Sequence, residues 1–265
     1  FNKLTEISDI FSSPKKLLKA ALNDENLELL SYAEETRRQD YLVYFALEKF
    51  SQRKAYNSMP IEKRQDIKVF FGKYSDAQKQ GENLLFSIAD VEQMIAAAQE
   101  AQATLPASLL CEGDSLFILP KYVELLPALL RVYVGAASLL YGDWEEADVI
   151  KIHLTSGKVT FMVYDDFEAP VPFLKERVKV KLAQQDIDYF DYVNPNRRPP
   201  FIGKSLLMEP DDTNYKKQFG LDKKLLEYGI LKKNTENIIS RGEWHNFLNR
   251  NSLELKGFRF FSMSK

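Results

Sequence analysis

The sequence has few of the residues that build reactive or metal-binding centres. Its 265 residues include one cysteine, Cys111, and two histidines, His153 and His245. A single cysteine excludes an internal disulfide and a cysteine-based zinc site, and two histidines leave little for a histidine-rich metal centre. A reducing compartment suits this composition. We therefore expect a cytoplasmic protein with no metal or cofactor of its own.

Glycine, long apolar runs and net charge are also scarce. No glycine precedes Gly72, and neither G-x-G-x-x-G nor G-x-x-x-x-G-K-[ST] occurs, so no loop is seen for a nucleotide, a dinucleotide or adenosylmethionine. No apolar run approaches the roughly 20 residues of a bilayer span, so we expect no membrane partner. The formal net charge of −2 excludes the strongly basic, histone-like class, but it allows a local basic face.

The residues that are present indicate a folded globular chain whose first part is helical. Apolar residues make up 45% and charged residues 28% of the sequence, which is ordinary for a protein with a core. Ser13-Pro14 resembles a helix start, because a hydroxyl caps the helix and proline fits its first turn. Pro127 should interrupt the last helix of this part. Further helices are predicted at 40–50, 60–71, 75–88, 90–103 and 121–141.

From about residue 146 the pattern changes to alternation of apolar and polar residues. Residues 148–167 (DVIKIHLTSGKVTFMVYDDF) predict a hairpin that turns at Thr155-Ser156-Gly157. Strands at 176–182 and 186–193 should follow, and then a proline-rich loop at 193–200. Short helices near 211–218, 221–229 and 242–250 precede a final strand at 253–261. We therefore predict an α+β fold with a helical region at 1–145 and an α+β region at 146–265, two regions that either fold separately or share one core.

A basic strand is the best sign of a binding partner. In residues 176–182 (ERVKVKL), Arg177, Lys179 and Lys181 should point to one side and the intervening apolar residues to the other. Neighbours on one side are about 6.8 Å apart, close to the spacing of phosphates along a nucleic-acid strand. An ordinary solvated sheet face is the alternative. The patch could be extended by cations at Lys175, Arg197, Arg198 and Lys204 and by aromatic rings at Tyr189, Phe190 and Tyr192.

Two further groups of residues have both a functional and a structural interpretation. Lys151, His153 and Lys158 could bind an anion on one strand face, although a histidine that bonds the backbone is equally compatible with the pattern. Trp144 and Trp244 are expected to be packing residues.

A metal-dependent nuclease is the most specific enzymatic alternative. Such enzymes hold magnesium with acids and use a lysine two residues after one of them. The pattern occurs at Asp66-Ile67-Lys68, Asp222-Lys223-Lys224 and Glu254-Leu255-Lys256. Only Glu254 falls in an expected strand, where Asp165 and Asp166 would be its partners. With 38 acids in the chain, chance matches are expected, so solvated surface charge explains the same residues.

Other acids and the cysteine leave two more alternatives. The acids at 165, 166, 186, 188 and 191 suit either general acid–base work or turn caps and ion pairs. Cys111 and His153 would form a nucleophile–base pair only if the fold brought them together, and G-x-S-x-G is absent.

Several blocks, in order and spacing, resemble the DNA phosphorothioation-associated methyltransferase family. The similarity covers roughly residues 40–192 and extends more loosely to the end. The blocks are residues 40–50 (DYLVYFALEKF), 59–60, 66–74 (DIKVFFGKY), 84–87 (LLFS), 126–135 (LPALLRVYVG), 147–153 (ADVIKIH), 158–159, 164–167 (YDDF), 243–244 and 257–258.

The resemblance implies a role in bacterial DNA modification and defence. In that family the S-adenosylmethionine-binding domain lies upstream of the matching blocks, and no position here matches its methyl-transfer residues. Because the chain starts at Phe1 rather than Met and lacks a signal peptide, we expect a piece of a longer protein.

Three functional hypotheses follow. The first is an accessory region that binds DNA or a partner protein of the modification system. The second is the magnesium-dependent nuclease, and the third is a purely structural protein-binding module. For the first, the expected contacts, mostly with phosphates, are Arg131, Lys151, His153, Lys158, Arg177, Lys179 and Lys181.

Overall fold

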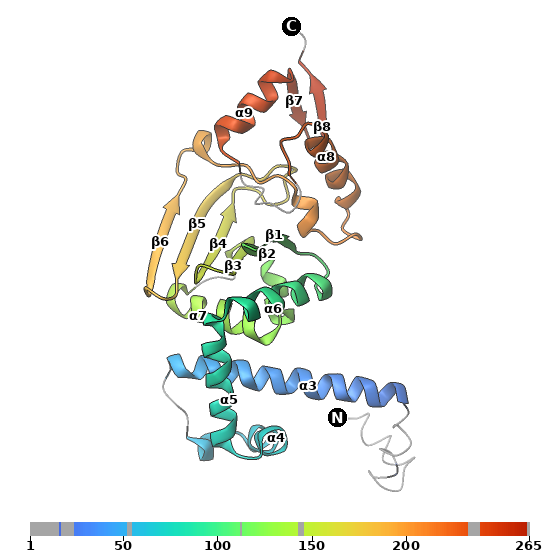
Figure 1. Cartoon of the computed structure of the whole chain (residues 1–265). Helices are drawn as coiled ribbons and strands as arrows, with labels where there is room; N and C mark the ends of the chain where they lie inside the picture. Colours follow the sequence, from blue (N-terminus) through green and yellow to red (C-terminus); the bar gives the residue numbers. More distant parts are fainter. Residues whose placement is uncertain are drawn as a thin grey trace.

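The structure is a computed structural model that describes residue 16 and residues 24–51, 55–111, 113–142, 146–232 and 239–263. Helices dominate the first half, and a six-stranded antiparallel sheet and a two-stranded sheet follow, which confirms the predicted α+β fold (Figure 1). The helix start expected at Ser13-Pro14 and the packing role expected for Trp144 lie outside the described residues. Within those residues, no helix combines the length and the apolar character needed to cross a bilayer.

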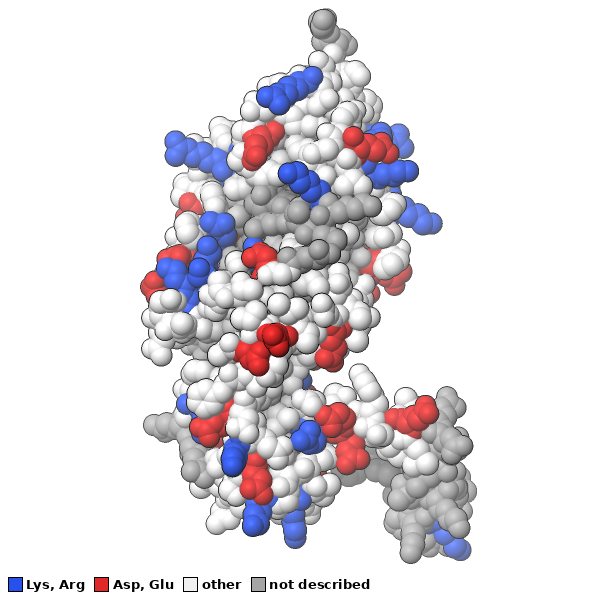
Figure 2. All heavy atoms as spheres, viewed as in Figure 1, with Lys and Arg blue, Asp and Glu red and all other residues white. Residues whose placement is uncertain are grey.

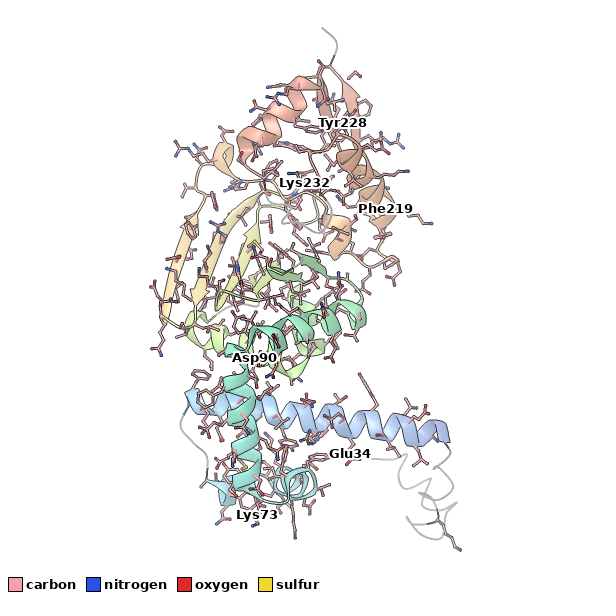
Figure 3. All side chains as sticks on the ribbon, in the orientation of Figure 1. Glu34, Lys73, Asp90, Phe219, Tyr228 and Lys232 are labelled. Atoms are coloured by element: carbon pink, nitrogen blue, oxygen red, sulfur yellow. The ribbon has the colours of Figure 1, made fainter. Side chains whose placement is uncertain are left out.

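The predicted helices of the first half are present, most with small shifts of their ends, but the helix expected at 40–50 begins much earlier, at Asp24. They are α3 (Asp24–Leu47), α4 (Ile61–Phe71), α5 (Tyr74–Phe86), α6 (Val91–Thr104) and α7 (Ala128–Tyr141). Asp90 caps α6, because its carboxylate accepts the backbone N–H groups of Glu92 and Gln93 (Figure 3). Pro127 directly precedes α7 and separates it from a 3₁₀ turn, η4 (Pro120–Leu125), so the interruption predicted there is confirmed.

Helices α3 and α5 pack closely because one glycine lies at their contact. A Cβ atom at Gly81 of α5 would lie 2.5 Å from the Cβ of Phe45 and 2.9 Å from the backbone N of Ala46. Phe45 is 1% exposed and contacts the rings of Tyr44, Phe71 and Tyr74. Since only glycine allows two helix backbones to approach so closely, Gly81 fixes the geometry of this helical part.

The large sheet is a meander in which each strand pairs with the next. Its strands are β1 (Leu109–Cys111), β2 (Ser115–Ile118), β3 (Val149–His153), β4 (Lys158–Tyr164), β5 (Leu174–Lys181) and β6 (Asp186–Asp191). The hairpin predicted at residues 155–157 joins β3 to β4, and Gly157 has the positive φ of 63° that this turn needs. The sequence pattern did not predict β1 and β2, which lie before residue 145 and pair with β3 through β2.

One face of the sheet carries the main core. Alternate residues such as Ile150, Phe161 and Val180 are buried against α6 and α7, in a cluster that joins residues from both sides of position 145. The opposite face is apolar only at one end, where Phe117, Met162 and Tyr164 pack against Phe201 and Leu207 of the following loop. The rest of that opposite face carries charged side chains.

The C-terminal part differs from the prediction in two elements. Residues 211–218 and 221–229 were expected as two helices, but one helix, α8 (Tyr215–Glu227), continues through Gly220 and ends before Gly229. The final strand at 253–261 is instead a hairpin of β7 (Leu253–Lys256) and β8 (Arg259–Ser262), since Gly257 turns the chain with a φ of 54°. Helix α9 (Arg241–Arg250) confirms the prediction at 242–250, and the buried Trp244 packs in the core of this part.

Candidate nucleic-acid interface

Six of the seven predicted contact residues share the sheet face opposite α7. In the sheet register, Lys151 lies opposite Thr160, and Thr160 lies opposite Lys179. Two residues along the strands, Lys158 lies opposite Lys181. Because side chains alternate along a strand, these residues occupy one face. We call it the basic face: Lys151, His153, Lys158, Arg177, Lys179 and Lys181.

Arg131, the seventh predicted contact, lies elsewhere. It is on α7, where its guanidinium pairs with Asp40 of α3 at 2.6 Å and with Glu124 at 2.8 Å. Its side chain is largely buried between these two acids. Arg131 therefore connects helices, and the fold does not bring it to the basic face.

Three cations of the basic face have no counter-ion among the described residues. We call them the basic triad: Lys158 on β4, and Arg177 and Lys179 on β5. Arg177 and Lys179 are two residues apart, about 6.8 Å. Lys158 is diagonal to Lys179 across the two strands, at about 7–8 Å. All three are half-buried, and in the described part of the chain no acid lies within ion-pair distance of them.

Arg177 has an unsatisfied donor within this triad. Its Nε atom is buried and has no hydrogen-bond partner in the described structure. The guanidinium carbon lies 4.5 Å from the ring centroid of Phe190, the residue opposite it on β6. The aromatic ring therefore holds the guanidinium by a cation–π contact and provides no acceptor for its N–H groups.

Lys151 and Lys181 are already engaged. The Lys151 ammonium is 3.5 Å from Asp114 and lies over the Phe117 ring, and the residue is only 5% exposed. Lys181 pairs with Asp186 at 3.1 Å and with Asp188 at 2.7 Å. Figure 2 shows blue and red side chains interleaved over the β5–β6 edge, on the left of the molecule. These two lysines therefore stabilise the sheet more than they attract an external anion.

His153 is kept neutral at physiological pH. Burial, with smaller effects of Lys151, Lys179 and Lys158, lowers the pKa of its imidazole to about 4, and Asp114 offsets this only in part. Its Nε2 lies 3.0 Å from the hydroxyl of Thr160. Sequence patterning did not single out Thr160, although alternation along β4 places it on the same face. His153 is thus a structural, uncharged member of the basic face.

The triad creates a positive local field. Burial is the main cause that lowers the pKa of Lys179, and the neighbouring charges of Arg177 and Lys158 lower it further. Asp188, which lies opposite on β6, partly offsets these effects. A cation whose pKa is lowered by neighbouring positive charges is destabilised by them, and an anion placed beside Lys179 would relieve that repulsion.

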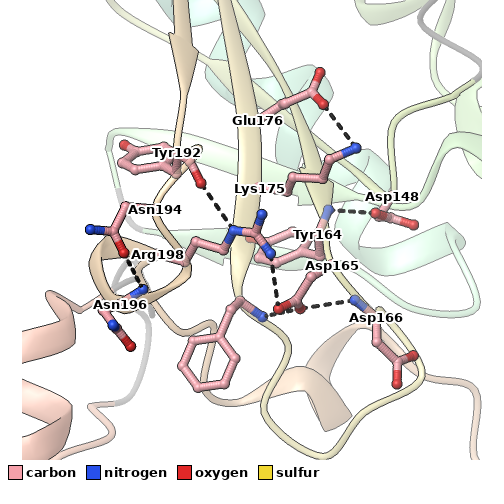
Figure 4. A network of polar contacts seen from close by, with 11 residues as sticks. Asp148, Tyr164, Asp165, Asp166, Lys175, Glu176, Tyr192, Asn194, Asn196 and Arg198 are labelled. Carbon is pink, nitrogen blue, oxygen red and sulfur yellow. Dashed lines mark hydrogen bonds and ion pairs between the residues drawn. The ribbon is translucent and has the colours of Figure 1, made fainter.

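The residues expected to extend the patch have other roles. Lys175 pairs with Glu176, and the buried Lys204 donates to the carbonyl oxygens of Phe167 and Ala169. Arg198 donates to the carbonyl oxygen of Tyr192 and lies near the Asp165 carboxylate (Figure 4). Among the expected aromatic groups, the Tyr189 hydroxyl donates to Glu176. Arg197 is exposed in the turn η6 (Pro195–Arg197), away from any strand.

The acids of the nuclease hypothesis are engaged in local structure. Asp165 accepts the backbone N–H groups of Asp166 and Phe173, and Asp166 accepts that of Glu168, so both cap the turn between β4 and β5 (Figure 4). Glu254 pairs with Lys256, two residues along β7, at 2.9 Å. In the described residues, no group of three acids, histidines or cysteines is arranged to hold a metal ion.

The other two acid-x-lysine matches are not on strands. Asp66 is on α4, where it accepts hydrogen bonds from Arg37 and Tyr41, and Asp222 is buried on α8, where it accepts the backbone N–H of Ser205. Both acids therefore join segments that are distant in the sequence.

Cys111 and His153 do not form a catalytic pair. Ser115 of β2 lies between them, since it is paired with Cys111 on one side and with His153 on the other. Two strand spacings, about 9.6 Å, therefore separate the two residues. This distance exceeds hydrogen-bond reach.

No protein-family model, no curated protein and no solved structure matches the chain. The family resemblance therefore stays a prediction, and the geometry of the basic face is the ground for a functional proposal.

Proposed function

We propose that the chain binds the phosphate backbone of DNA through the basic triad. In this proposal it is an accessory, non-catalytic region of a DNA phosphorothioation-associated methyltransferase system. The observation that carries the proposal is the triad itself, in which Lys158, Arg177 and Lys179 are gathered on one face without a counter-ion among the described residues. S-adenosylmethionine would belong to the upstream domain of that family, and the cytoplasm would be the site of action.

The spacing and geometry of the triad suit the regularly spaced phosphates of a nucleic-acid strand better than the carboxylates of a flexible peptide chain. Successive cations of the triad, in the order Lys158, Lys179 and Arg177, are about 7 Å apart, so neighbouring phosphates of one strand can each meet one of them. A planar guanidinium such as that of Arg177 can donate two parallel N–H bonds to one phosphate, which a lysine ammonium cannot match in geometry. Phe190 fixes the plane of that guanidinium, which reduces the entropy lost on binding.

Contacts of this type recognise the phosphate backbone of DNA rather than its base sequence. None of the triad residues is on a helix or loop that projects from the sheet, so they suit the outside of a duplex and not its groove floor. Sequence selection would then come from another part of the system. This division of work is consistent with an accessory region.

The test compares two charge reversals that change net charge equally. Lys179→Glu alters the triad, whereas Lys79→Glu alters an exposed residue of α5 on the helical part. Fluorescence anisotropy of labelled duplex DNA, plain and phosphorothioate, measures the affinity of the full chain. We expect Lys179→Glu to weaken binding at least about tenfold, because attraction becomes repulsion at a short distance, and Lys79→Glu to change it little.

Two results would reject the assignment. Equal losses in both variants would mean that only the overall charge matters. If the chain did not bind DNA even at low salt, but captured a partner protein of the modification system, the protein-binding hypothesis would replace it. Circular dichroism of each variant shows whether the fold is retained, which keeps a loss of binding interpretable.

A further inference from the structure

A second group of cations surrounds a hollow that lies outside the basic face. The hollow measures about 480 Å³ and lies between α8 and the β7–β8 hairpin. We call it the α8 pocket; its lining is Lys216, Lys217, Gly220, Lys224, Lys256, Phe258 and Arg259. Figure 2 shows blue side chains gathered on this side of the molecule, where Figure 1 places α8. No acid belongs to the lining, although the chain as a whole has more acids than bases.

The sequence builds this pocket by helical spacing and a tight turn. Lys217, Gly220 and Lys224 are three and four residues apart, so they share one face of α8. Gly220 has no side chain, and a Cβ atom there would have no neighbour within 4 Å, so the space between the two lysines is open. From the other side, Lys256 and Arg259 are directly paired at the end of the β7–β8 hairpin.

Most of these charges are not neutralised. The side chains of Lys216, Lys224 and Arg259 make no hydrogen bond or ion pair with any described residue. Lys256 pairs with Glu254 at 2.9 Å, and Lys217 donates only to the neutral side chain of Asn214, at 3.3 Å. Five exposed cations from two elements line one hollow, and a compact anion with more than one negative charge would pair with several of them at once.

The aromatic ring at the pocket suggests what the anion is attached to. Phe258 is in the two-residue turn of the hairpin, and the ammonium of Lys217 lies 5.9 Å from its ring centroid. A ring beside a cluster of cations is the arrangement that holds a nucleotide, since the phosphate meets the cations and the base stacks on the ring. The volume is also within the range of small-molecule sites.

We propose that the α8 pocket binds a nucleotide by its phosphate groups, with Phe258 against the base. The nucleotide is either free or part of a nucleic-acid strand, because both carry the same chemistry. The pocket shares no residue with the basic triad, so this proposal does not depend on the function proposed above.

The test is isothermal titration calorimetry of the full chain with inorganic pyrophosphate, ADP and a 12-nucleotide DNA strand. Lys224→Glu alters the pocket, and Lys223→Glu, its neighbour outside the lining, is the matched control. Gly220→Glu fills the hollow with an acid, whereas Gly220→Ala tests the effect of a side chain without charge. Because a Cβ atom at Gly220 has no close neighbour, both variants should fold.

We expect ADP to bind more tightly than pyrophosphate. Lys224→Glu and Gly220→Glu should weaken the binding of ADP at least about tenfold, whereas the affinity of Lys223→Glu for ADP should be close to that of the original chain. With Lys179→Glu as the background, so that the basic triad contributes little, tighter binding of ADP than of the strand at equal salt identifies a free nucleotide, and the reverse identifies nucleic acid. Failure of all three ligands to bind, or equal losses in the Lys223 and Lys224 variants, would overturn the proposal. Lys179→Glu should leave ADP binding unchanged, which separates the pocket from the basic triad.

Discussion

The titration of His153 should destabilise the chain on acidification, whereas Asp148 and Asp222, whose pKa values are raised by burial, act in the opposite direction. The His153 imidazole is half-buried beside the cations of the basic face, and its pKa is lowered from 6.5 to about 4, chiefly by burial. The unfolded chain therefore binds a proton at a higher pH than the folded chain does. Between these two values the proton favours the unfolded state, so stability falls as the pH falls from about 6.5 towards 4.

The magnitude follows from the size of the shift. A change from 6.5 to about 4 corresponds to roughly 3 kcal/mol once both states are protonated. Because the ring is only partly buried, solvent screening reduces this, and we expect a loss of about 1 kcal/mol between pH 7 and pH 5. Acids whose pKa is lowered, such as Asp66 and Asp90, add their own losses mainly below pH 4.

Urea denaturation followed by circular dichroism at pH 7, 6 and 5 measures this slope. His153→Asn removes the titrating ring, and its free energy of unfolding should change less over this range, by about 1 kcal/mol, than that of the original chain. His245→Asn changes the exposed histidine of α9 and serves as the control, with the original slope retained. If the His153 variant kept the full slope, the account of a neutral, buried imidazole on the basic face would be wrong.

Three further predictions concern packing and caps. Gly81→Ala should lower the free energy of unfolding by about 1–3 kcal/mol, because the new Cβ atom would lie 2.5 Å from the Cβ of Phe45. Urea denaturation measures this change. Gly220→Ala, also inside a helix but without a close neighbour, should instead stabilise by up to about 1 kcal/mol in the same assay. Ser240→Ala removes the capping box that Ser240 forms with Glu243, and thermal unfolding should show a loss of about 1 kcal/mol.

The sequence was most informative where periodicity decides orientation. Alternation in residues 176–182 separated Arg177 and Lys179 from Val178 and Val180, and the structure places the two valines in the main core. The same reasoning applied to β3 and β4 placed Lys151, His153 and Lys158 together. Local patterns could predict these shared faces because strand geometry alone determines which residues of a strand point to the same side.

Features that depend on contacts between residues distant in the sequence could not be predicted from local patterns. Arg131 was expected at the interface, but Asp40, 91 residues earlier in the chain, engages it. Strands β1 and β2 have three and four residues, too few for a periodic signal; β2 is held by pairing with β3, and β1 by pairing with β2. The helical spacing of lysines at 217 and 224 was visible in the sequence, whereas the docking of the β7–β8 hairpin beside them was not.

The most direct test of the central claim is the salt dependence of DNA binding. Anisotropy of a labelled duplex, titrated with the full chain at several salt concentrations, gives the slope of log affinity against log salt. Three phosphate contacts by Lys158, Arg177 and Lys179 predict a slope of about −2.7, and Lys179→Glu should reduce its size by about 0.9. Binding that does not change with salt, or a slope that the variant leaves unchanged, would contradict backbone recognition by the basic triad.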